Sequence, residues 1–211
     1  MSRYQIRELK DTVSPVIINP SHLRKLKLAS RTPHKVIHYD QYKSQDIVLK
    51  QPYISEDNLQ VVQCNVKRVY ETYKALTSNS NVVSTLGVVL DPPGIVQERL
   101  TCSLQQRLNA KESFSEEVAA SIIQDVVVGL AAFHNAGYVH GNISPGNILL
   151  QMENDDVQVA KVDDLSCEYV EINANLVNFS LTIKSVRVIL QLILLEPFPI
   201  LVVVIIIHLL H

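Results

Sequence analysis

The stretch that decides the fold of this chain is residues 140–150, which read HGNISPGNILL. It presents one imidazole and two carboxamides, from His140, Asn142 and Asn147, ahead of three apolar residues. A carboxamide can donate and accept hydrogen bonds, but it is no useful base near pH 7. A reaction that needs a base at position 142 therefore lacks one.

A long amphipathic pattern precedes this loop. Apolar residues recur at steps of three and four between residues 118 and 133, which predicts a core helix. We expect the helix to begin in the capping-box sequence SFSE at residues 113–116 and to end at Gly137 in a left-handed cap. The predicted apolar face consists of Val118, Ala119, Ile122, Ile123, Val126, Val127, Leu130 and Phe133.

A pair of carboxylates, Asp163 and Asp164, follows the apolar residues that come after the loop. Taken alone, the pair indicates a polar turn at the end of a strand. A carboxylate in this place also suits Mg²⁺, a hard cation that prefers oxygen ligands.

Together these segments resemble the catalytic loop of the eukaryotic protein kinases, H-R-D-x-x-x-x-N, and the D-F-G motif that follows it. His140 stands at the histidine, Asn142 at the catalytic aspartate and Asn147 at the metal-binding asparagine, while residues 164–166, DLS, stand at D-F-G. The resemblance implies an α+β kinase-like fold, with a small antiparallel β lobe carrying one helix and the first part of a helical lobe. It also implies ATP and Mg²⁺ as cofactors, with Asn147 and Asp164 as the metal ligands.

The upstream segments follow in kinase order. An apolar strand at residues 46–50 ends in Lys50, helical spacing at residues 58–76 carries Glu71, and NSNVV at residues 79–83 resembles the H-P-N-I-V that follows the regulatory helix. The resemblance implies that Lys50 contacts the phosphates of ATP and pairs with Glu71. The alternatives are a solvated edge charge at Lys50 and an ordinary exposed helix charge at Glu71.

A β-hairpin is predicted next, from two apolar runs at residues 82–90 and 95–100 that flank the turn sequence DPPG. The second run resembles the kinase hinge. The resemblance implies that Gln97 is the gatekeeper and that Glu98 and Leu100 offer backbone groups to adenine.

Departures from the kinase pattern bear on activity. No G-x-G-x-x-G lies before Lys50, and residues 35–44 contain no glycine, so close approach of backbone amides to phosphate is not expected there. Asn142 replaces the base, whose loss typically costs about 10²–10⁴ in rate, and Ser144 stands where many kinases place a lysine. We therefore expect a pseudokinase that works as a binding module. The alternative is an active kinase that transfers phosphate from ATP to Ser/Thr or Tyr of proteins.

The C-terminal residues 181–211 differ sharply in composition, and residues 202–207 are entirely β-branched aliphatic. One interpretation is a membrane anchor over residues 188–210, which is about long enough to span a hydrocarbon core but contains Glu196 and two prolines. A second is a buried strand or helix. A third is an end that is not native to the domain, which explains the change of composition together with the missing kinase motifs.

Composition limits the partners. The chain has 19 basic and 21 acidic residues among 211, a net charge of −2 and no basic stripe, so nucleic acid is not expected. We expect protein partners or substrates, and a cytoplasmic location because no signal peptide precedes the domain; the alternative is anchoring through the C-terminal tail. The expected divisions are an N-terminal extension over residues 1–35, with a strand at 16–18, and a partial kinase-like domain over residues 36–180.

Overall fold

The computed structural model describes residues 14–136, 138 and 140–164 of the 211-residue chain. The chain divides into two compact units. The first comprises the described residues up to Lys74 together with Thr85–Glu98, and the second comprises Ala75–Ser84 and the described residues from Arg99 onward. The predicted cap at Gly137, the DLS residues after Asp164 and the whole C-terminal tail lie outside the described residues.

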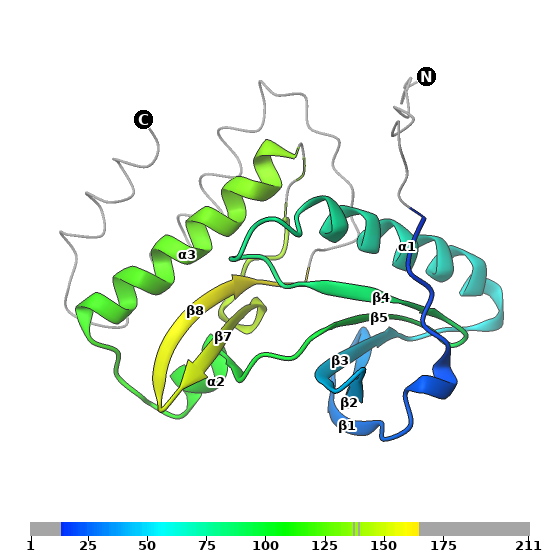
Figure 1. Ribbon diagram of the computed structural model, residues 1–211, viewed down its shortest axis with the longest axis horizontal. Helices are drawn as coiled ribbons and strands as arrows, with labels where there is room; N and C mark the ends of the chain where they lie inside the picture. Colours follow the sequence, from blue (N-terminus) through cyan, green and yellow to red (C-terminus); the bar gives the residue numbers. More distant parts are fainter. Residues whose placement is uncertain (1–13, 137, 139, 165–211) are drawn as a thin grey trace. The chain divides into compact units, whose positions relative to one another are not determined.

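The first unit is built on a five-stranded antiparallel sheet with the strand order β1-β2-β3-β5-β4 (Figure 1). Lys43 and Ser44 connect β2 to β3, with φ values of 50° and 65°, as a two-residue hairpin turn of matching twist requires. The strands are β1 (Lys27–Arg31), β2 (Lys35–Tyr42), β3 (Gln45–Pro52), β4 (Thr85–Leu90) and β5 (Pro93–Glu98). The predicted hairpin of residues 82–90 and 95–100 is therefore confirmed as β4, which begins three residues later than predicted and ends at the predicted residue, and β5, which lies two residues earlier.

One face of β4 and β5 is covered by α1 (Leu59–Ala75), the predicted helix. Val66 and Tyr70 of this helix are buried against Val88 of β4, with Ile95 of β5 beside them. The i, i+4 spacing of the two helix residues places them on one face, which explains why the periodic pattern predicted the helix to within one residue at each end.

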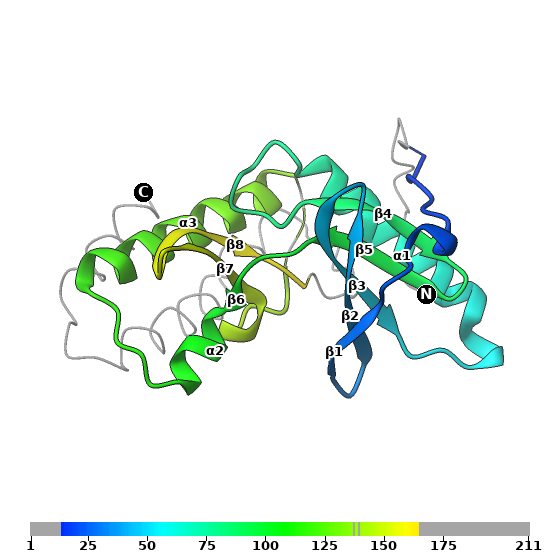
Figure 2. The same ribbon diagram turned by 60° about the horizontal axis from the view of Figure 1, so that its bottom comes forward.

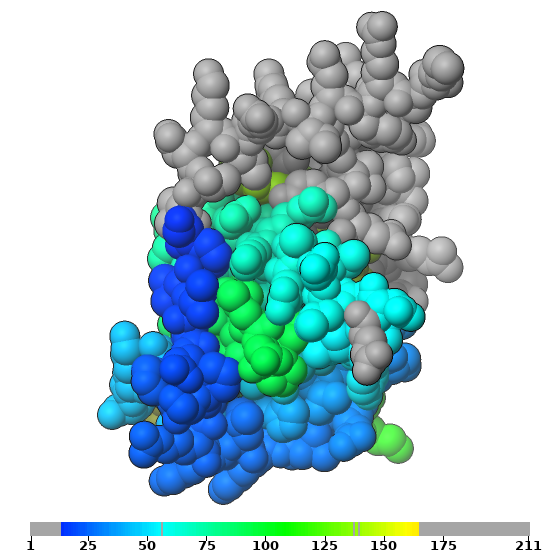
Figure 3. All heavy atoms as spheres, turned by 90° about the vertical axis from the view of Figure 1, so that its right-hand side faces the viewer, coloured from blue at the N-terminus to red at the C-terminus, as the bar shows by residue number. Residues whose placement is uncertain are grey.

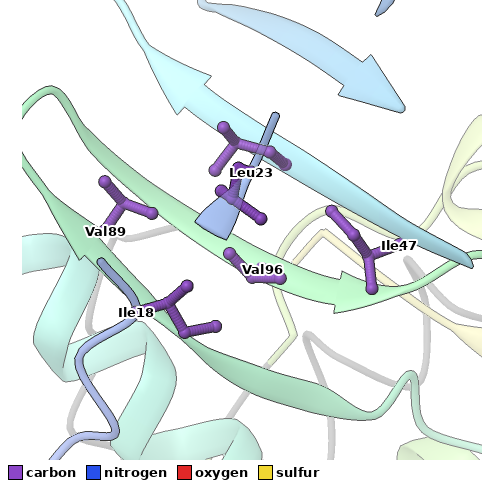
Figure 4. Packing of buried hydrophobic residues seen from close by; sticks show 6 residues of the cluster. Ile18, Leu23, Ile47, Val89 and Val96 are labelled. Carbon is purple, nitrogen blue, oxygen red and sulfur yellow. The ribbon is translucent and has the colours of Figure 1, made fainter. Parts of the chain in front are cut away.

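The segment before β1 supplies side chains for the opposite face of the sheet. Successive strand residues point to opposite faces, so Val89 and Val96 point away from α1, and they pack in one cluster with Ile18 and Leu23 (Figure 4). The Ile18 N–H donates to the Val88 carbonyl at 2.8 Å, in an isolated parallel bridge along the edge of β4. Figure 3 shows the dark-blue N-terminal segment beside the green β4–β5 hairpin at the surface.

The sheet extends beyond the predicted N-terminal boundary of the domain. The expected division at residue 35 falls inside the sheet, because β1 precedes it and pairs with β2. Its sequence KLASR does not alternate between apolar and polar residues, and only its central residue is half-buried, so the pattern gives no strand signal. The predicted strand at residues 16–18 forms a single bridge rather than a full ladder.

The second unit combines a small sheet with a long helix. The sheet has the order β6-β7-β8, and α3 packs against β8 (Figure 2). Gly129 of α3 lies so close to the 79–83 segment that an added Cβ would stand 2.6 Å from the Asn81 carbonyl oxygen. The elements are β6 (Cys102–Ser103), α2 (Leu104–Asn109), α3 (Glu116–Asn135), β7 (Ile148–Glu153) and β8 (Asp156–Val162).

The predicted core helix is confirmed as α3, but its cap is not the expected one. Ser115 is the N-cap and its hydroxyl accepts from the Val118 N–H at 3.4 Å, so the prediction of a capping box starting at Ser113 is wrong. Among the described residues, α3 is the helix long and apolar enough to cross a membrane by length and composition. A core helix passes the same test, and α3 buries Ile122, Ile123, Val126, Leu130 and Phe133.

Candidate functional site

The loop of residues 140–147 is organised around His140, which is 1% exposed. Its Nδ1 accepts the Asn142 N–H at 3.3 Å, so Nε2 carries the proton and donates to the Asp163 carbonyl at 2.8 Å. The ring also packs edge-on against Phe133, with centroids 5.2 Å apart. Because both ring nitrogens are used on the backbone, His140 braces the loop and is not available as a base.

Asn142 is an exposed residue with contacts on both sides of the loop. Gly141 has a φ of 73°, a left-handed conformation that glycine adopts readily, and it directs the chain around His140. The Asn142 side-chain amide donates to the Asp164 carboxylate at 3.1 Å and more weakly to the Asp164 carbonyl at 3.4 Å. The backbone carbonyl of Asn142 accepts a hydrogen bond from the Asn147 side chain at 2.8 Å. The structure therefore brings together Asn142, Asn147 and Asp164.

Asn147 is the last residue of a short 3₁₀ helix, Pro145–Asn147, which leads into β7. Its N–H donates to the Ser144 carbonyl and its carbonyl accepts the Asp163 N–H, both at 2.9 Å. Asp164 follows β8 with a φ of 63°, a conformation that aspartate tolerates better than most residues. The loop and the end of β8 are thus held together by backbone hydrogen bonds as well as by side chains.

The side chains of this site that could bind a metal ion would do so through oxygen atoms. In the part of the chain that the structure describes, no group of three or more His, Cys, Asp or Glu side chains could hold a metal. The Asn147 nitrogen is engaged with Asn142, which leaves its oxygen for a ligand, and Asp164 adds a carboxylate. Mg²⁺ is commonly held by one or two carboxylates, with water and substrate phosphates completing its shell. Asn147 and Asp164 fit such an ion as a partial ligand set.

Two further polar residues support the end of β8, and the sequence reasoning missed them. The Asn81 side chain donates to the Ala160 carbonyl at 3.1 Å, and its backbone carbonyl accepts the Val162 N–H at 2.8 Å. The Asp125 carboxylate accepts the Ala160 N–H at 2.8 Å. The sequence could have indicated Asp125, because it is an acidic residue within the apolar stretch of α3.

The first unit contains Lys50, which is predicted to contact phosphate, and Glu71, which is predicted to pair with Lys50. Lys50 is half-buried on β3, in register with Ile37 of β2 and Ile95 of β5. Glu71 is half-buried on α1, which fits the predicted regulatory helix rather than an exposed charge. Their ion pair and their contact with ATP stay predictions.

The segment predicted to be the hinge runs across the boundary of the two units. Gln97 is 2% exposed and its side chain donates to the Thr85 hydroxyl at 3.2 Å, so the predicted gatekeeper is a buried, hydrogen-bonded amide. Glu98 ends β5 and Leu100 is buried two residues later. The unit boundary falls directly after Glu98, while the hinge role and the contacts with adenine stay predictions.

The turn that corresponds in strand order to a glycine-rich loop connects β1 to β2, ahead of residues 35–44. Those residues form β2 and its turn into β3. The β1–β2 turn contains Thr32, Pro33 and His34, and the Thr32 hydroxyl accepts the N–H groups of His34 and Lys35 at 3.3 and 3.1 Å. The β1–β2 turn contains no glycine either, since the first glycine of the chain is Gly87.

Comparison with known proteins agrees with this geometry. The family model of the protein kinase domain matches residues 35–179, more than half of the 211 residues. The chain therefore belongs to the protein kinase domain family.

Individual relatives match over shorter stretches. The chain is 28% identical over 102 residues to Calcium-dependent protein kinase 5 of Oryza sativa subsp. japonica, which covers 47% of this chain and 19% of that protein. It is 42% identical over 50 residues to Serine/threonine-protein kinase PkaB of Streptomyces coelicolor, covering 24% of this chain and 12% of that protein. It is 28% identical over 126 residues to the Calcium and calcium/calmodulin-dependent serine/threonine-protein kinase of Lilium longiflorum, 58% of this chain and 24% of that protein. The chain thus spans at most about a quarter of these relatives.

Proposed function

We propose that this chain is a pseudokinase module, a kinase-like domain that binds protein partners and does not transfer phosphate at a useful rate. The observation that carries the proposal is the Asn142 amide, which donates a hydrogen bond to Asp164 at 3.1 Å. A general base at this position would have to accept the proton of the substrate hydroxyl. The Asn142 side chain is neutral, and its nitrogen is committed to Asp164, which follows β8.

Two features of the phosphate-binding side support the proposal. Ser144 carries no charge where a lysine would neutralise the transferring phosphate. The β1–β2 turn places Thr32 and Pro33 where glycines would let backbone amides approach phosphate, and proline has no N–H to offer. Since positioning and charge stabilisation carry almost all of phosphoryl transfer, these losses add to that of the base.

Weak binding of ATP with Mg²⁺ forms part of the proposal. When bound, the ion would neutralise charge on the phosphate oxygens. Asn147 and Asp164 would hold it, and Lys50 would contact the phosphates. We propose protein partners for the module, a cytoplasmic location, and no role in binding nucleic acid. Membrane anchoring through residues 188–210 is the alternative for its location.

The test is transfer of radiolabelled phosphate from ATP to a mixture of protein substrates by the purified chain. We expect a rate far below the roughly 1–100 s⁻¹ of protein kinases. Asn142→Asp alone is expected to restore little, because Ser144 and the β1–β2 turn remain. Lys50→Met serves as the control for contaminating kinases, since a contaminant would be insensitive to it. A rate near 1 s⁻¹ or above that Lys50→Met abolishes would overturn the proposal.

An active protein kinase is the second candidate function. The observation that favours it is the retention of Asn147 and Asp164, both hydrogen-bonded to Asn142, since these are the residue types that hold the metal ion. The same transfer assay decides between the two functions.

A further inference from the structure

The backbone of Asn142 is held by two hydrogen bonds, independently of the contacts of its side chain. Its N–H donates to the ring of His140 at 3.3 Å, and its carbonyl accepts from the Asn147 side chain at 2.8 Å. The His140 ring is itself buried and held by the Asp163 carbonyl. The direction in which the Asn142 side chain leaves the loop is therefore set by these hydrogen bonds.

The orientation of the Asn142 amide follows from the chemistry of its neighbours. The two atoms that it meets are the Asp164 carboxylate oxygen, at 3.1 Å, and the Asp164 carbonyl oxygen, at 3.4 Å. Both are acceptors, so only the NH₂ end of the amide can face them. An aspartate at position 142 would instead place a carboxylate oxygen against an oxygen of the same charge.

The Asn142 contact falls on a residue with a left-handed backbone conformation. Its φ of 63° is uncommon for a residue other than glycine and persists where surrounding contacts favour it. The Asn142 NH₂ group touches both the side chain and the carbonyl of this residue. The contact joins residues 22 positions apart in the sequence, across the loop and the end of β8.

We propose that Asn142 is a positioning residue that holds Asp164 in place, a function that replaces the proton acceptance expected at this position in a kinase. One uncharged NH₂ group supplies a hydrogen bond to the Asp164 carboxylate and a second, weaker one to the Asp164 carbonyl. The contact thereby ties the loop to the end of β8. This inference deepens the proposed function and rests on its assignment of the site.

The test exchanges the two side chains and follows the metal-free protein. Hydrogen–deuterium exchange of residues 140–149 and 156–164, together with the melting temperature, is measured in EDTA on the whole chain. The variants are Asn142→Asp, Asp164→Asn and the double variant that carries both changes. We expect Asn142→Asp to speed exchange in both segments and to lower Tm by about 3–6 °C, the effect of losing a hydrogen bond to a charged group in a chain of this size.

The double variant is the decisive arm. It restores one amide and one carboxylate with their positions reversed, so it should recover most of the exchange protection and of the Tm lost by Asn142→Asp. If the effects of the two changes simply add, the residues are not coupled and the proposal is overturned. An unchanged Asn142→Asp variant would overturn it as well. Should Asn142→Asp fail to fold, a folded double variant supports the proposal and an unfolded one refutes it.

Asn109→Asp is the matched control. Asn109 is exposed at the end of α2 in the same unit, and it accepts a hydrogen bond from Gln105 through its oxygen, which an aspartate retains. We expect no change of exchange in residues 140–149 or 156–164 from this variant. Because no nucleotide enters the experiment, a negative result leaves the phosphate-transfer test of the proposed function standing on its own.

Discussion

At the scale of single residues, the loop of residues 140–147 shows how an asparagine at position 142, where kinases have an aspartate, changes the chemistry of a site. The Asn142 nitrogen gives the Asp164 carboxylate a hydrogen-bond partner at 3.1 Å, whereas an aspartate would repel it. The sequence identified both residues, because each stands in a recognisable pattern. It could not predict their contact, which depends on two left-handed backbone conformations, at Gly141 and Asp164.

Two thiols of the described chain differ in their surroundings. Cys64 is exposed on α1, while Cys102 lies on β6 in register with Leu150 of β7. Burial raises the pKa of the Cys102 thiol above its ordinary value of 9.0; Arg107 opposes this effect and Glu112 adds to it. Since the thiolate is the nucleophile, a raised pKa leaves less of the reactive form at any pH below it.

We predict that iodoacetamide alkylates Cys102 more slowly than Cys64 at pH 8, because burial raises the pKa of the Cys102 thiol. The rates are measured for each cysteine by mass spectrometry of peptides from the folded protein. A denatured sample is the control, in which the two rates should become similar. Equal rates in the folded protein at pH 8 would contradict the prediction.

At the scale of elements, the helices and most strands could be predicted because their apolar periodicity is strong. Both α1 and α3 occur where the three-and-four spacing places them. The cap of α3 could not be located, since Ser113 and Ser115 are both good capping residues, and the structure shows that the Ser115 hydroxyl is the one that accepts the Val118 N–H. The strand β1 gave no pattern because its edge position leaves most of its side chains exposed.

The packing of α3 on the 79–83 segment leads to a second prediction. Gly129→Ala would gain helix propensity, about 1 kcal/mol. The added Cβ would, however, lie 2.6 Å from the Asn81 carbonyl oxygen and 2.9 Å from a Val162 methyl group. Neither can retreat easily, because the Asn81 carbonyl accepts the Val162 N–H. We expect a net loss of about 1–3 kcal/mol in the free energy of unfolding, as for other overpacked sites.

Urea denaturation of Gly129→Ala measures this loss. Ala131→Gly is the control, because Ala131 is exposed on the same helix and reports helix propensity without packing. It should cost about 1 kcal/mol. A Gly129→Ala variant that is more stable than the unsubstituted chain would show that the close approach to Asn81 is relaxed at no cost.

At the scale of the whole molecule, the order of elements carries the identification. The family match over residues 35–179 runs through both units, and it lies within one residue of the predicted domain at 36–180. Sequence order could predict this because each segment, from the strand of Lys50 to the loop of Asn147, keeps its place along the chain. What it could not predict is that the sheet begins before residue 35, at β1, where the family match has not yet started.

The predicted cofactor contacts draw on both units, with Lys50 in the first and Asn147 and Asp164 in the second. We predict that millimolar Mg-ATP raises the melting temperature of the purified chain. A concentration tenfold above Kd stabilises a folded protein by about 1.4 kcal/mol, which corresponds to roughly 3–6 °C for a chain of this size. Asp164→Ala should abolish the shift, because it removes the carboxylate expected to hold the ion.

Asp156→Ala is the matched control, an exposed aspartate at the start of β8 that should leave the Mg-ATP shift intact. Lys50→Met should reduce the rise in melting temperature caused by Mg-ATP, because the lysine attracts phosphate. It should not abolish the response of the melting temperature to Mg²⁺ alone, because the lysine repels the ion. If Mg-ATP produces no shift at millimolar concentration, the module binds no nucleotide, and its function as a partner-binding domain depends on surfaces other than the loop of residues 140–147. A shift that survives Asp164→Ala would show that nucleotide binds without the predicted metal ligand.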